Sequence, residues 1–117
     1  MSAPACISPF DVVEGQFEAY NAQDLDAFCA FYDDRAEIAD FNGAVTASGI
    51  AAVRARHAKL FADFPQNQAE LRARIVLGNR IIDHERVSRT PGGDTFEVAA
   101  IYTIADAKIV RVDFVRP

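Results

Sequence analysis

The stretch Asn21–Val53, NAQDLDAFCAFYDDRAEIADFNGAVTASGIAAV, contains the features that decide the fold. Its pattern predicts a short helix, a strand that carries one acid (Asp40), a turn at Asn42-Gly43 and the start of a longer helix. Asp40 alternates with Ile38, so both side chains should point to the same apolar side of the strand. A carboxylate in an apolar cavity is desolvated and suits a general base near neutral pH. The alternative is an acid at the rim of a pocket, paired with an arginine.

Length and composition indicate one globular domain over residues 1–117, with 1–8 as a loose N-terminal tail. Half of the 117 residues are hydrophobic and nine are Phe, which is enough for a core without disulfides. The net charge of −5 argues against a nucleic-acid partner, since phosphate binding needs a basic surface. The N-terminus has no signal-peptide pattern and no apolar run reaches membrane-spanning length. We therefore expect a cytoplasmic protein with no membrane partner.

The two cysteines do not predict a disulfide framework. Cys6 lies in the tail, and Cys29 lies in a Phe-rich helical segment, where we expect a small buried hydrophobic residue. Two cysteines without a secretion signal are too few for a disulfide-stabilised fold.

Capping patterns predict three helices before a series of strands. Ser8-Pro9 begins the first helix with Asp11 three residues after the cap, Asp24 caps the second, and Ser48 caps the third, which Pro65 ends. The pattern then changes to strands separated by short breaks, which favours hairpins and an α+β domain with a curved, mostly antiparallel sheet around a pocket. The expected strands are Ala36–Asn42, Glu70–Leu77, Arg80–Thr90, Thr95–Ile104 and Lys108–Arg116.

One sheet face is only half polar. In the strand from 95 to 104, alternation separates an apolar set from a mixed set on the opposite face. A half-polar outer face suits contact with a second copy, so we expect a homodimer through it. The apolar set is Phe96, Val98, Ala100, Tyr102 and Ile104, and the mixed set is Glu97, Ala99, Ile101 and Thr103.

The order of elements and the local sequence resemble the NTF2-like superfamily, near its SnoaL-like and ketosteroid-isomerase branch. The segments that carry this are NAQDLDAF (21–28), FYDDRAEIADFNG (31–43), ASGIAAVRARHAKLF (47–61), IVLGNRIIDHERV (75–87), FEVAAIYTI (96–104) and KIVRVDFV (108–115). The resemblance implies a cone-shaped fold. This superfamily contains isomerases, cyclases, dehydratases, epoxide hydrolases and members with no chemistry, so fold does not settle function.

Alignment with the ketosteroid isomerases implies specific site residues. Their catalytic aspartate falls on Asp40, their first oxyanion tyrosine on Gln16, a pocket tyrosine of helix three on His57, and their second oxyanion donor on Tyr102. The base position matches and both donor positions are changed. Glutamine and tyrosine can still donate hydrogen bonds, so the resemblance leaves proton transfer possible and steroid specificity in doubt.

The resulting hypothesis is a cofactor-free acid–base enzyme of isomerase or cyclase type, acting on a small hydrophobic carbonyl compound. Asp40 would be the base, Tyr102 the hydrogen-bond donor to the substrate oxygen, and His57 a helper. Tyr102 could instead be a hydrogen-bonded core tyrosine, and His57 a satisfied core histidine. The alternatives are a protein that binds a hydrophobic ligand unchanged, or a dimeric interaction module with a vestigial pocket. The expected ligand-binding residues are Gln16, Phe17, Phe61, Val112 and Phe114.

The segment 83–86 carries four charged or titratable residues in a row. Alternation places Asp83 and Glu85 on one face and His84 and Arg86 on the other, so only one pair can face the pocket. The pattern does not say which, and a solvated ladder of cross-strand pairs is the favoured interpretation. No metal is expected, because the two histidines show no ligand spacing, and no nucleophile or phosphate-loop motif is present.

Overall fold

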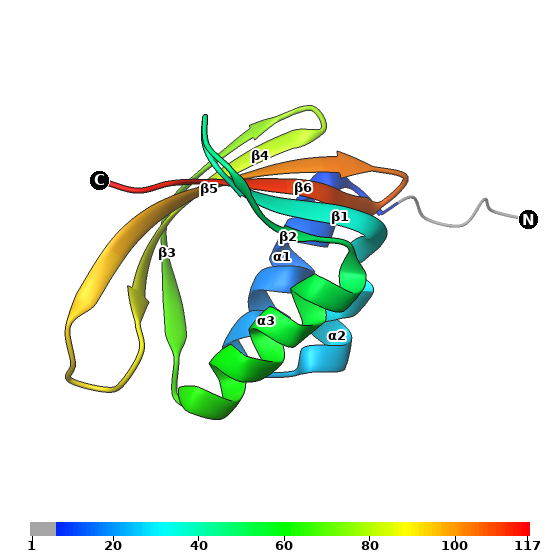
Figure 1. Ribbon diagram of the computed structural model, residues 1–117. Helices are drawn as coiled ribbons and strands as arrows, with labels where there is room; N and C mark the ends of the chain where they lie inside the picture. Colours follow the sequence, from blue (N-terminus) through cyan, green and yellow to red (C-terminus); the bar gives the residue numbers. More distant parts are fainter. Residues whose placement is uncertain (1–6) are drawn as a thin grey trace, which may run out of the picture.

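The computed structural model describes residues 7–117 as three helices and one curved six-stranded sheet (Figure 1). Cys6 and most of the tail predicted over 1–8 lie outside the described residues. The elements are α1 (Pro9–Asn21), α2 (Leu25–Ala30), β1 (Tyr32–Asp40), β2 (Val45–Ser48), α3 (Ile50–Asp63), β3 (Gln68–Leu77), β4 (Arg80–Ser88), β5 (Thr95–Ala105) and β6 (Lys108–Val115).

The predicted helix starts are confirmed for α1 and α2 and wrong for α3. Ser8 and Asp11 form a reciprocal capping box, and Asp24 accepts a hydrogen bond from the Ala27 amide at 3.1 Å. The third helix is capped at Gly49, whose φ of 87° favours glycine, while Ser48 ends β2. This short strand was missed because the turn at Asn42-Gly43 returns the chain for only four residues.

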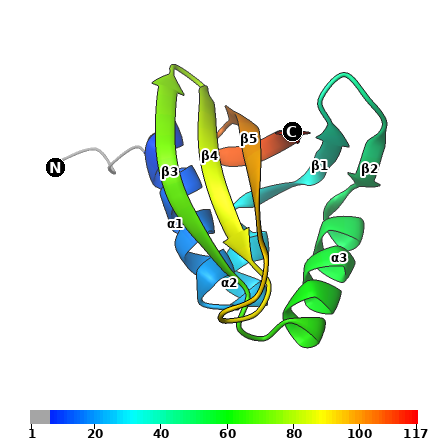
Figure 2. The same ribbon diagram turned by 90° about the vertical axis from the view of Figure 1, so that its left-hand side faces the viewer.

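The sheet order is β2-β1-β6-β5-β4-β3. All neighbours are antiparallel except β1 and β6, whose parallel pairing aligns Ile38 with Val112 and Asp40 with Phe114. The helices lie against one face, where α1 contacts β3, β4 and β6, and α3 contacts β1 and β2 (Figure 2). The α+β prediction is thereby confirmed.

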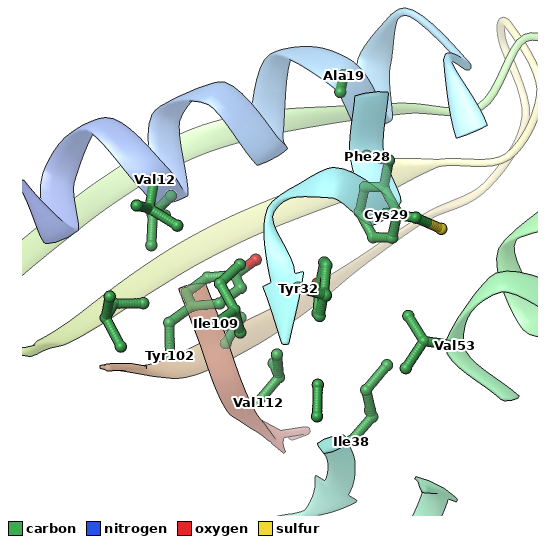
Figure 3. Close-up of a cluster of buried hydrophobic side chains, with 14 of the residues drawn as sticks. Val12, Ala19, Phe28, Cys29, Tyr32, Ile38, Val53, Tyr102, Ile109 and Val112 are labelled. Atoms are coloured by element: carbon green, nitrogen blue, oxygen red, sulfur yellow. The ribbon is translucent and has the colours of Figure 1, made fainter. Parts of the chain in front are cut away.

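The core lies between the three helices and the β1–β6–β5 part of the sheet. Val12 of α1, Phe28 of α2 and Val53 of α3 belong to one buried cluster with strand residues such as Ile38 (Figure 3). Each of these four is at most 1% exposed. Cys29 is buried in the same cluster, as expected. In the described part of the chain, no helix has the length and apolarity needed to cross a bilayer.

Candidate functional site

A cavity of about 340 Å³ lies between α1, α3 and the inner face of the sheet. Its floor consists of buried side chains and its mouth of exposed ones, because the sheet curves away from the C-terminal half of α3. The buried lining residues are Gln16, Phe28, Tyr32, His57, Glu85, Val87, Val98 and Tyr102, and the exposed ones are Arg56, Lys59, Asp63, Phe96 and Arg116. Phe17, Tyr20, Leu60, Phe64, Arg89 and Phe114 line it between these two levels.

A hydrogen-bonded chain of three polar side chains crosses the floor. The Tyr32 hydroxyl donates to Gln16 Oε1 at 3.1 Å, and Gln16 Nε2 donates to the Tyr102 hydroxyl oxygen at 3.4 Å. Burial raises the pKa of both phenols, and the nearby Glu85 carboxyl adds to the rise. Both hydroxyls therefore keep their protons. The Tyr32 hydroxyl proton is hydrogen-bonded to Gln16. The Tyr102 hydroxyl proton has no acceptor among residues 7–117 and is available for a hydrogen bond to a ligand.

Asp83 and Glu85 are the pair that faces inward. Asp83 is fully buried and receives two hydrogen bonds from Arg74, at 2.6 and 2.9 Å, and Arg74 also bonds Glu14 of α1 at 2.8 Å. On the outer face, His84 Nε2 lies 2.7 Å from a carboxylate oxygen of Glu97. The favoured interpretation of a solvated ladder is correct for His84 and wrong for Asp83 and Glu85.

Glu85 is a buried carboxyl group without a partner. Its residue is 7% exposed, and its side chain makes no hydrogen bond to any other described residue. Its pKa is raised to about 8, chiefly by burial and also by the Asp83 carboxylate, while Arg74 opposes the rise. Near neutral pH this group can exchange a proton with a bound molecule. The signal in the sequence was the alternation of Ile81, Asp83, Glu85 and Val87, whose two apolar members are buried.

His57 is neutral and lies against aromatic rings. Its Nδ1 is 2.8 Å from the Val53 carbonyl oxygen, so this nitrogen carries the proton and Nε2 is an acceptor. Burial lowers its pKa to about 4, and the ring of Phe28 packs with its centroid 4.3 Å away. His57 therefore offers a lone pair to the cavity rather than a positive charge.

Asp40 is not in the apolar environment that its alternation with Ile38 suggested. Its side chain is 49% exposed and pairs with Arg116 at 2.6 Å. Asp40 is the last residue of β1 and lies beside Phe114 of β6, so the arginine two residues further along reaches it. It matches the alternative of a rim acid paired with an arginine. Arg116 lines the cavity, whereas Asp40 does not.

The remaining predicted residues divide into two groups. Gln16, Phe17 and Phe114 line the cavity. Phe61 and Val112 do not: Val112 is 1% exposed in the core, and Phe61 packs edge-on against aromatic neighbours. Both face inward as periodicity indicated, but neither is part of the cavity lining. Among the described residues, no three His, Cys, Asp or Glu side chains converge as they would around a metal ion.

Comparison with known proteins identifies the family. The model of the SnoaL-like domain matches residues 13–112, which is most of the chain. The chain belongs to the SnoaL-like family. No curated protein matches it.

Several solved structures share the fold of this SnoaL-like protein. An uncharacterized cystatin-fold protein from Novosphingobium aromaticivorans is 33% identical, with 93% of this chain and 98% of that chain covered and a TM-score of 0.86. A proposed polyketide cyclase from Sinorhizobium meliloti is 25% identical over 90% of this chain and 94% of the other, with a TM-score of 0.76. A proposed ketosteroid isomerase from Kribbella flavida has a TM-score of 0.79 at 13% identity, covering 93% and 77% of the two chains. The NTF2-like resemblance is confirmed.

Proposed function

We propose that this SnoaL-like protein is a cofactor-free acid–base enzyme of isomerase or cyclase type, acting on a small hydrophobic carbonyl compound in the cavity. The observation that carries the proposal is Glu85, a buried carboxyl with no hydrogen-bond partner among residues 7–117 that shares one cavity with the free hydroxyl proton of Tyr102. Groups whose pKa is displaced toward neutrality by burial in a pocket are typical of catalytic sites. The name of the Sinorhizobium meliloti relative, a proposed polyketide cyclase, agrees with this class of chemistry.

The proposed reaction begins with proton removal. The ionised Glu85 carboxylate takes a proton from a carbon next to the substrate carbonyl, and the C–H electron pair moves into an enolate. Tyr102 donates its hydrogen bond to the enolate oxygen, where the negative charge develops. In a β,γ-unsaturated substrate the intermediate is a dienolate, and Glu85 then returns the proton to its γ carbon, which moves the double bond into conjugation and gives the isomer. In a cyclase, the enolate carbon would instead attack a second carbonyl of the same molecule, and the new alkoxide would take the proton from Glu85.

His57 and Asp40 have secondary places in this proposal. His57 Nε2 can accept a hydrogen bond from a substrate hydroxyl and so orient the substrate. The resemblance assigns the base to Asp40, and that role stays a prediction. Glu85 is the better candidate because Asp40 already holds Arg116 and lies outside the cavity lining.

Hydrogen–deuterium exchange tests this proposal without knowledge of the natural substrate. A panel of small cyclic ketones, 1,3-diketones and steroid enones is incubated with protein in D₂O, and loss of the α-proton signal is followed by NMR. We expect the wild type to accelerate exchange of at least one compound. Glu85→Gln should slow that exchange about 100-fold or more, because general-base catalysis contributes on this order. Asp40→Asn, the matched carboxylate control, should change it less than about tenfold.

The pH dependence adds a second criterion. With Glu85 as the base, exchange should increase with pH and level off above its pKa of about 8. Exchange that is unchanged in Glu85→Gln would remove Glu85 from the mechanism, and loss in Asp40→Asn alone would return the base role to Asp40.

The second candidate function is a binding protein that holds its ligand unchanged. It is favoured by the pKa of Glu85, which leaves most of that carboxyl protonated at neutral pH, so that it can serve as a hydrogen-bond donor. This candidate predicts saturable ligand binding without exchange of any panel compound. A vestigial pocket filled by phenylalanines has less support, because the cavity measures about 340 Å³.

A further inference from the structure

The cavity lining above its buried floor is rich in positive charge, although the chain as a whole has a net charge of −5. Four cationic side chains line it. Lys59 pairs with Asp63 at 2.7 Å and Arg116 pairs with Asp40 at 2.6 Å. Arg56 and Arg89 form no ion pair with any carboxylate in the described part of the chain. One cavity is therefore lined by two guanidinium groups, Arg56 at the exposed level and Arg89 below it, that form no ion pair with any described residue.

Arg56 is held in place by a neutral neighbour. Its Nη1 donates to Thr46 Oγ1 of β2 at 2.9 Å, which fixes the side chain of α3 against the β1–β2 hairpin. Desolvation lowers the pKa of this guanidinium, and the positive charges of Arg116 and Arg89 lower it further. Its Nε and Nη2 groups have no acceptor among residues 7–117.

Arg89 is positioned by aromatic and amide groups. Its Nη1 donates to Asn67 Oδ1 at 2.7 Å and to the Tyr20 hydroxyl at 3.4 Å. The guanidinium carbon lies 4.9 Å from the ring centre of Phe96 and 6.0 Å from that of Phe64. Stacking and a single donor group hold the plane of the guanidinium while Nε and Nη2 remain free to bind.

Free guanidinium donors in a fixed plane fit one type of ligand group. Arginine binds carboxylates through paired N–H groups, and an anion shared by two arginines would relieve their repulsion. The lining of the same cavity is otherwise largely aromatic and aliphatic, and it includes Phe17, Phe114 and Val98 beside Glu85. The site therefore combines an anion-binding opening with an apolar interior.

We propose that the substrate of this cavity is an apolar carboxylic acid whose carboxylate binds between Arg56 and Arg89 while its hydrophobic body extends toward Glu85. This inference rests on the proposed function, since it names the substrate class of the same site. Its test measures binding alone and can fail independently of catalysis.

The test compares two ligands of equal size that differ in charge. Binding of 2-naphthoate and of the neutral ketone 2-acetonaphthone is measured by isothermal titration calorimetry at about pH 6.5, below the pKa of Glu85. We expect naphthoate to bind about tenfold more tightly, and the preference to weaken with added salt.

Variants then locate the preference. Arg56→Gln should weaken naphthoate about fivefold or more and leave the ketone within about twofold. Arg89→Gln should act in the same direction. Arg89→Lys, which keeps the positive charge, and thermal unfolding of both variants check that loss of the Asn67 and Tyr20 contacts does not unfold the protein. Arg72→Gln is the matched control, because Arg72 pairs with Glu70 away from the cavity.

Equal affinity for both ligands, no binding of either, or an equal loss of both in Arg56→Gln would overturn the inference. Exchange catalysis with equal affinities would leave the proposed function intact and remove only the acidic substrate. A naphthoate preference that depends on Arg56, without exchange of any ketone, would remove only the catalysis.

Discussion

Asp83 and Glu85 lie two residues apart on one face of β4, yet their carboxyl groups meet different surroundings. Arg74 of β3 compensates the charge of Asp83 with two hydrogen bonds. Glu85 faces the cavity instead, and burial without a partner disfavours its charged form. The same carboxyl chemistry therefore gives a structural ion pair at Asp83 and a candidate proton carrier at Glu85.

The raised pKa of Glu85 makes a prediction for stability. Its folded pKa of about 8 exceeds the ordinary value, so its contribution is complete below about pH 4.5 and is lost as pH rises to about 8. The lowered pKa of His57 has the opposite effect on stability, which it increases as pH rises, and it acts only between about pH 4 and 6.5. Between about pH 6.5 and 8 the wild type should therefore lose about 1 to 2 kcal/mol of unfolding free energy that Glu85→Gln retains. Urea unfolding at both pH values measures this, and equal losses in both proteins would contradict it.

At the scale of elements, one ion network ties three of them together. Arg74 of β3 bonds Asp83 of β4 and Glu14 of α1, and its side chain is 9% exposed. This network anchors the N-terminal helix α1 to strands β3 and β4.

Breaking this network should be costly. Arg74→Gln leaves the fully buried carboxylate of Asp83 uncompensated, so we expect a loss of about 3 kcal/mol or more in unfolding free energy. The double variant Arg74→Gln/Asp83→Asn should recover part of that loss, because it removes the unpaired charge. Arg72→Gln, at an exposed pair on the same strand, should change stability by less than about 1 kcal/mol. A similar small effect of Arg74→Gln in chemical denaturation would show that Asp83 is solvated.

At the scale of the whole molecule, the helices cover one sheet face and leave the other uncovered. On β5 this outer face carries the half-buried Ala99 and Ile101, flanked by the exposed pair of His84 and Glu97. We propose that a second copy covers this face, as its half-polar pattern suggests.

The dimer predicts a concentration-dependent mass. Sedimentation equilibrium at micromolar concentration should give twice the chain mass of 12.8 kDa. Ile101→Glu should shift the mass toward the monomer, because it places a charge in an apolar contact. Val76→Glu, at an exposed position on the opposite face of the edge strand β3, where it pairs with the inward-facing Ile81, is the control and should leave the mass unchanged. A monomer at every concentration would remove the proposal.

The sequence by itself determined the class of fold and all the elements but the short strand β2, because capping boxes, alternation and turn residues act over a few neighbouring positions. Ser8 and Asp24 begin their helices as predicted, Asn42-Gly43 turns the chain, and alternation placed Tyr102 inside. Only the tertiary structure decided the chemistry of the acids. Burial and charge depend on neighbours from distant segments: Arg116 holds Asp40 at the rim, Arg74 neutralises Asp83, and no described side chain forms a hydrogen bond or ion pair with Glu85.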